Sequence, residues 1–210
     1  MDTTLRSLPV VAALMVAVIT AAPVAAVEGW AGPTRVVAAL SPISPSMVLD
    51  AGGSAHVAFL EASAAGPPGI FYATNLGDGW HKERVTTGDD FYARPSIGLD
   101  SAGNVFIAFA RVTCPDPKDP SCEDGTSQIY IAANKTGAWV VNARTAGPAD
   151  IAPSLVVRDG KLHVAFQRRV FPDFLGGPDS GVWYATNASG GWVETQVASA
   201  EGKCYLDQFP

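Results

Sequence analysis

The sequence has few charged residues and no cluster of basic ones. Its 14 Lys and Arg and 20 Asp and Glu leave a formal net charge of −6 over 210 residues. Proteins that bind nucleic acid or anionic membrane surfaces usually carry a basic stripe. The composition therefore argues against both kinds of partner. The apolar content of 48% is ample for a hydrophobic core, which argues against a disordered chain.

Several catalytic signatures are also absent from the sequence. It contains no Gly-x-Ser-x-Gly nucleophile elbow, no phosphate-binding loop, no His-Glu-x-x-His metal motif and no dinucleotide-binding fingerprint. Apolar residues at helical spacing are lacking beyond the N-terminal segment. The sequence thus predicts a protein made of strands, with no bound cofactor.

Residues 1–26 have the features of a secretory signal. Arg6 precedes an apolar stretch at 8–19, and small residues at 24–26 suit a cleavage site, so the mature chain would begin at Val27. An uncleaved membrane anchor is the alternative, because the apolar segment approaches spanning length, but two prolines and many alanines disfavour it. We expect a secreted, extracellular protein.

Three cysteines are too few for a disulfide framework. Cys114 and Cys122 flank a proline-rich insert, and in an exported protein this spacing predicts a local disulfide. A metal pair is the weaker alternative, because no His or third thiol lies nearby. Cys204 has no evident partner. Calcium is a weak candidate ligand of the acidic side chains of the insert, which are otherwise expected to be solvated: Asp116, Asp119, Glu123 and Asp124.

Three copies of one pattern fill most of the chain. Each copy starts at Pro-Ser, passes a Gly-containing turn to a segment ending in Ala-Phe, continues to a segment ending in Ala-Asn or Thr-Asn, and ends near Gly and Trp. The starting prolines, Pro45, Pro95 and Pro153, are 50 and 58 residues apart (95 − 45 and 153 − 95). A period near 50 built from short β segments is typical of propeller blades.

Each copy is expected to form four short antiparallel strands, which make one blade. In the second copy the strands are predicted at 96–99, 104–110, 128–134 and 138–143. Residues alternate in character along them, and Asn- and Gly-rich links favour hairpin turns. The fold class predicted is therefore all-β, a β-propeller of four-stranded antiparallel blades. Its blades are blade 1 at 45–94, blade 2 at 95–152 and blade 3 at 153–209.

Three blades are too few for a closed ring, because propellers typically have about 4–8. Segment 27–44 is expected to be a linker that contains one N-terminal strand, the outer strand of a closing blade, because Trp30 to Val37 resembles the end of a blade. Pro210 would then start a missing blade. We expect a fragment with an incomplete ring, whose open blade edges could associate with another fragment or with a second copy.

Recurring aromatic and histidine residues have structural explanations. Trp80, Trp139 and Trp192 occupy one register at the fourth strand, and the repetition predicts that they pack between neighbouring blades. His56 and His163 share a register inside a strand that Phe106 occupies in the second copy, so we expect hydrogen-bonded strand residues rather than a catalytic role.

Together, the Pro-Ser start, the Asp/Gly turn, Val-Ala-Phe, Tyr-Ala-Thr-Asn and Gly-x-Trp resemble the sialidase-like, BNR-repeat β-propellers that bacteria secrete. The resemblance covers residues 30–210. In sialidases the Asp-box, Ser-x-Asp-x-Gly-x-Thr-Trp, lies late in the blade, whereas the Asp50 and Asp100 turns come early here. The resemblance implies an alternative function, an exo-α-sialidase-type glycoside hydrolase with its catalytic residues partly in missing blades. Of the family's arginine triad, Arg94-Pro95 is similar to the early Arg-Ile-Pro motif but lacks the Ile, and one arginine in a loop before a strand is the favoured explanation.

Equivalent charged residues suggest a ligand site at one end of the blades. Glu61, Arg111 and Arg168 each lie two residues beyond the shared Phe, and Arg94 comes from a loop on the same side. They are candidates for a ring around the channel mouth, which would suit a polar or anionic ligand or a glycan. Salt bridges between neighbouring blades are the competing and favoured explanation. Our leading hypothesis is a module that binds a glycan or a cell-surface partner and is not an enzyme.

Overall fold

The computed structural model describes residues 35–36, 42–63, 66–88, 90–115, 125–170 and 179–200, all within the unit formed by residues 35–210. These residues form twelve β-strands. Within these ranges no helix is long and apolar enough to cross a membrane. The secretory segment 1–26 and most of the predicted N-terminal strand lie outside the described residues.

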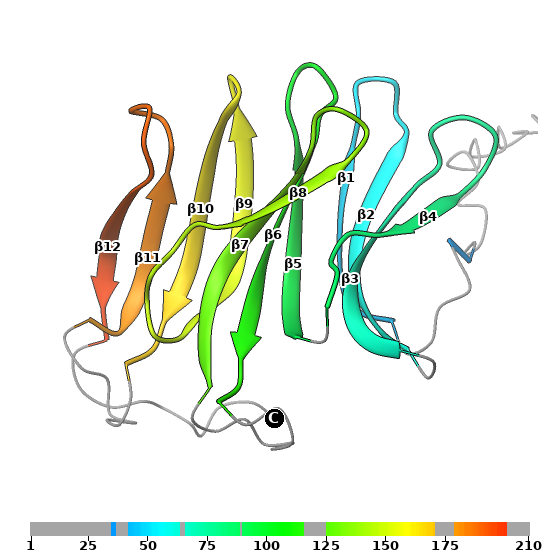
Figure 1. Cartoon of the computed structure of the whole chain (residues 1–210). Helices are drawn as coiled ribbons and strands as arrows, with labels where there is room; N and C mark the ends of the chain where they lie inside the picture. Colours follow the sequence, from blue (N-terminus) through cyan, green and yellow to red (C-terminus); the bar gives the residue numbers. More distant parts are fainter. Residues whose placement is uncertain are drawn as a thin grey trace, which may run out of the picture. The chain divides into compact units, whose positions relative to one another are not determined.

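The strands form three separate antiparallel sheets, each with four strands in sequence order (Figure 1). Blade 1 contains β1 (Pro42–Leu49), β2 (Ala55–Ser63), β3 (Gly66–Thr74) and β4 (His81–Arg84). Blade 2 contains β5 (Phe91–Leu99), β6 (Val105–Thr113), β7 (Thr126–Asn134) and β8 (Trp139–Ala143). Blade 3 contains β9 (Asp150–Arg158), β10 (Lys161–Arg168), β11 (Gly181–Thr186) and β12 (Val193–Ser199).

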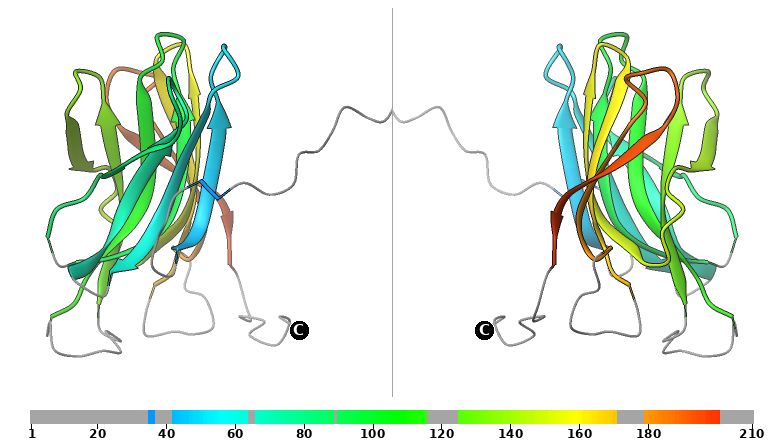
Figure 2. Two further views of the ribbon diagram at one scale, coloured as in Figure 1. Left: turned by 90° about the vertical axis from the view of Figure 1, so that its right-hand side faces the viewer. Right: turned by 90° about the vertical axis from the view of Figure 1, so that its left-hand side faces the viewer.

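The sheets stand side by side, and the first strands β1, β5 and β9 are neighbours in that order (Figure 1). This is the arrangement of successive blades in a β-propeller whose ring is open. The predicted fold class is confirmed. The tight hairpin turns after the first strands lie at one end of the sheets, which we call the turn end (residues 50–54 and 100–104), as the side views show (Figure 2). The second strands finish at the opposite end, which we call the loop end (residues 61, 111 and 168).

Blade 2 has both faces buried because it lies between two other blades. Along β6, Ile107 and Phe109 belong to the core shared with blade 1, whereas Phe106 and Ala108 belong to the core shared with blade 3. Strands covered on both sides are apolar along their buried length, and β6 follows this rule from Val105 to Ala110.

A bulge recurs in the first strand of every blade. Ser44, Arg94 and Ala152, each directly before a proline, have φ angles of 52°, 49° and 54°. The pairing with the second strand shifts at each of these sites. A bulge accommodates a proline without ending the strand. The first strands therefore begin before the Pro-Ser pair, and β5 starts at Phe91 rather than at residue 96.

The serine of each Pro-Ser pair connects its blade to the next one. The Ser46 hydroxyl accepts a hydrogen bond of 3.2 Å from the backbone N–H of Ile97. The Ser96 hydroxyl accepts one of 2.9 Å from the N–H of Leu155. The same contact thus joins blade 1 to blade 2 and blade 2 to blade 3.

The tryptophans of the fourth strands pack backwards onto the preceding blade. Trp139 contacts the Tyr72 ring edge-on at 5.5 Å, and its Nε1 donates to Glu83 Oε1 at 2.9 Å. Trp192 packs against the core between blades 2 and 3, where the Arg144 guanidinium lies 5.3 Å from the centre of its ring. Both tryptophans therefore pack between blades, as their register predicts.

The strand histidines are hydrogen-bonded within their own blades. His56 Nδ1 lies 2.5 Å from the Tyr72 hydroxyl, and His163 Nδ1 lies 2.5 Å from the Tyr184 hydroxyl. In blade 2 the tyrosine register is held by Ile131. Both histidines are therefore hydrogen-bonded strand residues, as their register predicts.

Candidate functional site

The three charged residues beyond the shared Phe occupy one equivalent position at the loop end. Glu61 pairs with Pro42 at the start of β1, Arg111 with Tyr92 near the start of β5, and Arg168 with Asp150 at the start of β9. Their side chains therefore enter the same region of each blade. What each one contacts there differs from blade to blade.

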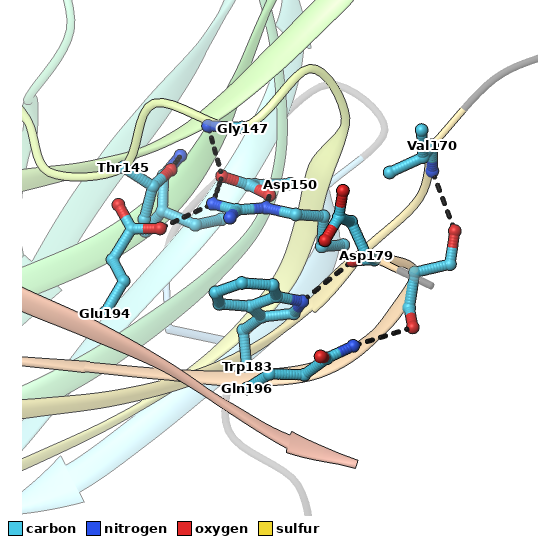
Figure 3. A network of polar contacts seen from close by, with 11 residues as sticks. Thr145, Gly147, Asp150, Val170, Asp179, Trp183, Glu194 and Gln196 are labelled. Carbon is cyan, nitrogen blue, oxygen red and sulfur yellow. Dashed lines mark hydrogen bonds and ion pairs between the residues drawn. The ribbon is translucent and has the colours of Figure 1, made fainter. Parts of the chain in front are cut away.

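Arg168 is the centre of an ionic network with Asp150 and Glu194, two residues labelled in Figure 3. Its Nε and Nη2 donate to the two carboxylate oxygens of Asp150 at 2.6 and 2.9 Å, and Nη2 also donates to Glu194 Oε2 at 2.6 Å. Asp150 is fully buried and accepts a further bond of 3.2 Å from the N–H of Gly147. These bonds to Asp150, followed by those to Glu194, raise the pKa of Arg168, which stays a cation.

Arg111 has a more exposed version of this arrangement. Its Nη2 lies 2.7 Å from Asp90 Oδ2, and Nη1 donates to the Tyr130 hydroxyl at 3.4 Å. Burial alone would lower the pKa of Arg111, but the hydrogen bond and the charge of Asp90 raise it. Asp90 precedes β5, so this ion pair lies in the connection between blades 1 and 2.

Glu61 is the acidic member of the set and is also paired. Its Oε2 accepts a hydrogen bond of 2.8 Å from Lys82 Nζ, which reaches it from β4 of the same blade. Arg94 differs from the other three, because it is exposed and has no ion pair with any described residue. The four predicted residues thus share an end of the sheets, but three of them are held in ion pairs and do not form a ring of free charges.

An aromatic residue beneath each charged group is a feature that the sequence analysis missed. Phe71, Tyr130 and Trp183 pair with the shared Phe of the second strand in their blades. Lys82 Nζ lies 5.0 Å from the centre of the Phe71 ring, Arg111 Cζ 5.2 Å from that of Tyr130, and Arg168 Cζ 4.2 Å from that of Trp183. Aligning the third segments of the repeat would have shown this aromatic register.

Trp183 has the largest ring of this register and the most polar surroundings. The side chain is half-buried, and its Nε1 donates to the backbone carbonyl of Asp179 at 2.9 Å. Gln196 lies beside it and donates from Nε2 to the Ser180 carbonyl at 3.2 Å (Figure 3). The indole is thus fixed in orientation, with a guanidinium near one face.

A hollow of about 490 Å³ lies at the turn end, away from these residues. It is lined by the turns that contain Asp50 and Asp100. The Asp50 carboxylate accepts backbone N–H groups of its own turn, and the hydrogen bond from Ser54 is the main reason why the pKa of Asp50 is lowered. Asp100 is bonded in the same way. We take the loop end as the candidate site, because a cation lies over an aromatic ring there in all three blades.

Tyr92 is also held by polar contacts at the loop end. Its hydroxyl donates to the Thr87 carbonyl at 3.2 Å and lies 3.4 Å from Asp90 Oδ2. Burial and then the charge of Asp90 raise the pKa of Tyr92.

The predicted disulfide and calcium site cannot be located in the described residues. Cys114 follows β6, whereas Cys122 and the acidic insert at 116–124 lie outside them. The pairing of Cys114 with Cys122 stays a prediction, as does the weak calcium site. Within the described ranges, no group of three or more His, Cys, Asp or Glu side chains could hold a metal ion.

Comparison with known proteins identifies the fold but no family. No protein-family model matches the sequence, and the curated proteins contain no significant match. Among solved structures, an ulvan lyase of polysaccharide lyase family 25, bound to -[GlcA(1-4)Rha3S]-, is similar with a TM-score of 0.54 and 12% identity over 80% of this chain and 44% of its own. A family 117 glycoside hydrolase from Zobellia galactanivorans has a TM-score of 0.51 and 13% identity over 78% and 58%.

A GH43_1 enzyme from Xanthomonas citri, complexed with xylotriose, is similar to the chain with a TM-score of 0.50 and 14% identity over 80% of this chain and 61% of its own. The chain therefore spans about half the length of these enzymes, between 44% and 61%. At this identity the likeness establishes a shared β-propeller fold. It does not identify the sialidase-like or BNR-repeat group in particular.

Proposed function

We propose that the chain is a secreted glycan-binding protein whose ligand lies at the loop end of its blades. The observation that carries this proposal is the aromatic register with a cation over each ring, which is repeated in all three blades as Phe71, Tyr130 and Trp183. An aromatic face packs against the apolar face of a sugar, while nearby polar groups bond its hydroxyls.

The best position for such a ligand is around Trp183, which packs against the core shared by blades 2 and 3. We call this region the seam between blades 2 and 3. Glu194 and Gln196 of β12 provide polar groups beside the indole, and Asp179 lies near its Nε1. Arg168 is held by two carboxylates, so its guanidinium is fixed against one face of the ring. Groups fixed in this way lose little conformational entropy when a ligand binds.

The structural neighbours support a carbohydrate ligand in general terms. One was solved with a sulfated polysaccharide unit and another with xylotriose, and both share the propeller fold. The exposed Arg94, which has no ion pair among the described residues, adds a cation at the loop end that would suit an acidic sugar.

Binding is favoured over sialidase-type hydrolysis by the state of the charged groups. A sialidase clamps a substrate carboxylate with free arginines, but Arg111 and Arg168 are already paired with Asp90 and Asp150. These observations favour a module that holds a glycan without cleaving it.

Isothermal titration calorimetry on the full chain tests the proposal. The ligands are xylotriose, a disaccharide repeat of glucuronic acid and sulfated rhamnose, and sialyllactose. We expect at least one to bind, and Trp183→Ala to weaken that binding by about 10-fold or more. Val140→Ala, on the exposed outer strand β8, is the control and should bind as the wild type does.

Two outcomes would contradict the proposal. Absence of binding to all three sugars at millimolar concentration would remove the glycan ligand. Turnover of a fluorogenic sialoside would show an enzyme instead of a binding module. Circular dichroism of Trp183→Ala distinguishes a lost contact from a lost fold.

A further inference from the structure

Blade 3 exposes apolar residues whose equivalents in blade 1 are buried. Val182 of β11 is 46% exposed, whereas Ile70 and Ile129, at the same register of β3 and β7, are 0% exposed. Val197 of β12 is exposed, whereas its blade 1 equivalent Val85 is buried, and the half-buried Arg144 takes this place in blade 2. In blades 1 and 2 the next blade covers these positions. The face of blade 3 is built like a face that another blade covers.

Blade 1 shows the complementary difference on its opposite face. Met47 of β1 is 63% exposed, whereas Ile97 and Leu155, at the same register of β5 and β9, are 5% and 7% exposed. Each buried equivalent is covered by the blade that precedes it. The outer face of blade 1 is therefore built to lie against a preceding blade.

The serine hydrogen bond that joins successive blades leaves one acceptor unused on blade 3 and one donor position unused on blade 1. Ser154 is exposed and has no hydrogen-bond partner among the described residues, although Ser46 and Ser96 accept an N–H from the next blade. Met47 occupies the register whose N–H makes that donation in blades 2 and 3. The two halves of one contact thus lie at opposite ends of the three-blade array.

The tryptophan contact repeats this complementarity. Tyr184 of blade 3 holds the register of Tyr72, which contacts Trp139 of the following blade. Trp80 of blade 1 belongs to the tryptophan register of the repeat and is only half-buried. A blade 1 placed after blade 3 would bring Trp80 onto Tyr184.

We propose that a second copy of this chain docks its blade 1 face onto the blade 3 face. The two faces match residue by residue, because the chain itself contains two junctions of the same kind. The described parts of two copies contain six blades, within the range of about 4–8 that closed propellers have. The result is a symmetric dimer with two identical junctions.

Sedimentation velocity of the full chain tests this arrangement. We expect a dimer at micromolar concentration, with a melting temperature that rises with concentration. Met47→Glu and Val182→Glu each place a charge in the junction and should each raise the dissociation constant by about 100-fold or more. Val140→Glu is the matched control, because Val140 is exposed to a similar degree (56%) but lies on β8 of the middle blade.

Three results would overturn the proposal. If the wild-type chain stays monomeric at a concentration about 100 times higher, something other than a second copy covers these faces. A dimer that survives both Met47→Glu and Val182→Glu would use a different surface. Assemblies larger than two would show that the junction does not close into a six-bladed ring. Circular dichroism of both variants separates a lost junction from a lost fold.

Discussion

Replacing Arg168, the cation of the buried network at the loop end, tests how strongly burial determines the energy of that ion pair. In Arg168→Ala, the fully buried Asp150 keeps only the hydrogen bond from the N–H of Gly147. Breaking a buried ion pair by removing one partner costs about 3–5 kcal/mol, because an uncompensated charge stays in the interior. We expect the free energy of unfolding to fall by about that amount.

Arg111→Ala is the internal comparison, because it removes the equivalent residue of blade 2. The Arg111 side chain is 35% exposed and that of Asp90 24%, against 10% for Arg168 and 0% for Asp150. Ion pairs that solvent reaches contribute about 0.2–1 kcal/mol. The same substitution at the same register should therefore cost several times less in blade 2.

Urea denaturation followed by circular dichroism measures both values. A double-mutant cycle with Asp150→Ala assigns the loss to the pair, because Arg168→Ala should cost far less once Asp150 is absent. Equal costs for Arg168→Ala and Arg111→Ala would refute the reasoning, since burial would then not determine the strength of the pair. Additive costs of Arg168→Ala and Asp150→Ala in the double-mutant cycle would also refute it, since the two side chains would then not interact.

The other predictions concern the blade junctions, the turns and the insert. Ser96→Ala leaves an N–H of the next blade without its acceptor and should cost about 1–3 kcal/mol in urea denaturation, whereas Ser154→Ala should cost under about 0.5 in the monomer. Burial alone would raise the pKa of Asp100, but hydrogen bonds within its turn lower it, so its contribution to stability is present above the ordinary pKa of 3.8 and is lost as pH falls through the lowered value. Asp100→Asn should therefore destabilise the chain at neutral pH and converge with the wild type in strong acid. Non-reducing peptide mapping should link Cys114 to Cys122, and a link from either one to another cysteine would contradict the pairing.

The strands could be predicted because their signals are local and repeated. Pro45, Pro95 and Pro153 fix the start of each copy, and short apolar segments such as 105–109, bounded by Gly- and Asn-containing turns, indicate strands. The positive φ of Arg94 could not be predicted in this way. A residue before proline avoids helical conformations in isolation, and it is the pairing with the second strand that forces the bulge here.

The site could be predicted in part, because equivalent register is a property of the sequence but ion pairing is not. Glu61, Arg111 and Arg168 do share one position, as the repeat indicates. Their partners come from three different places in the blade and follow no repeat: Lys82 lies on β4, Asp90 in a connection and Asp150 on β9. Only the fold brings each pair together.

The charged residues share one register, but their partners differ from blade to blade. This difference suggests how one of three similar blades could provide the proposed binding site. Every described blade places a paired cation over an aromatic ring at the loop end, and the ion pair differs from blade to blade. The ring itself grows from Phe71 to Tyr130 to Trp183 along the chain. A larger ring offers more apolar area to a sugar, and the charge above it is most firmly held where Asp150 is buried. The seam between blades 2 and 3 therefore combines the largest platform with the most rigid support, and substitutions there should affect ligand binding more than the same changes in blade 1.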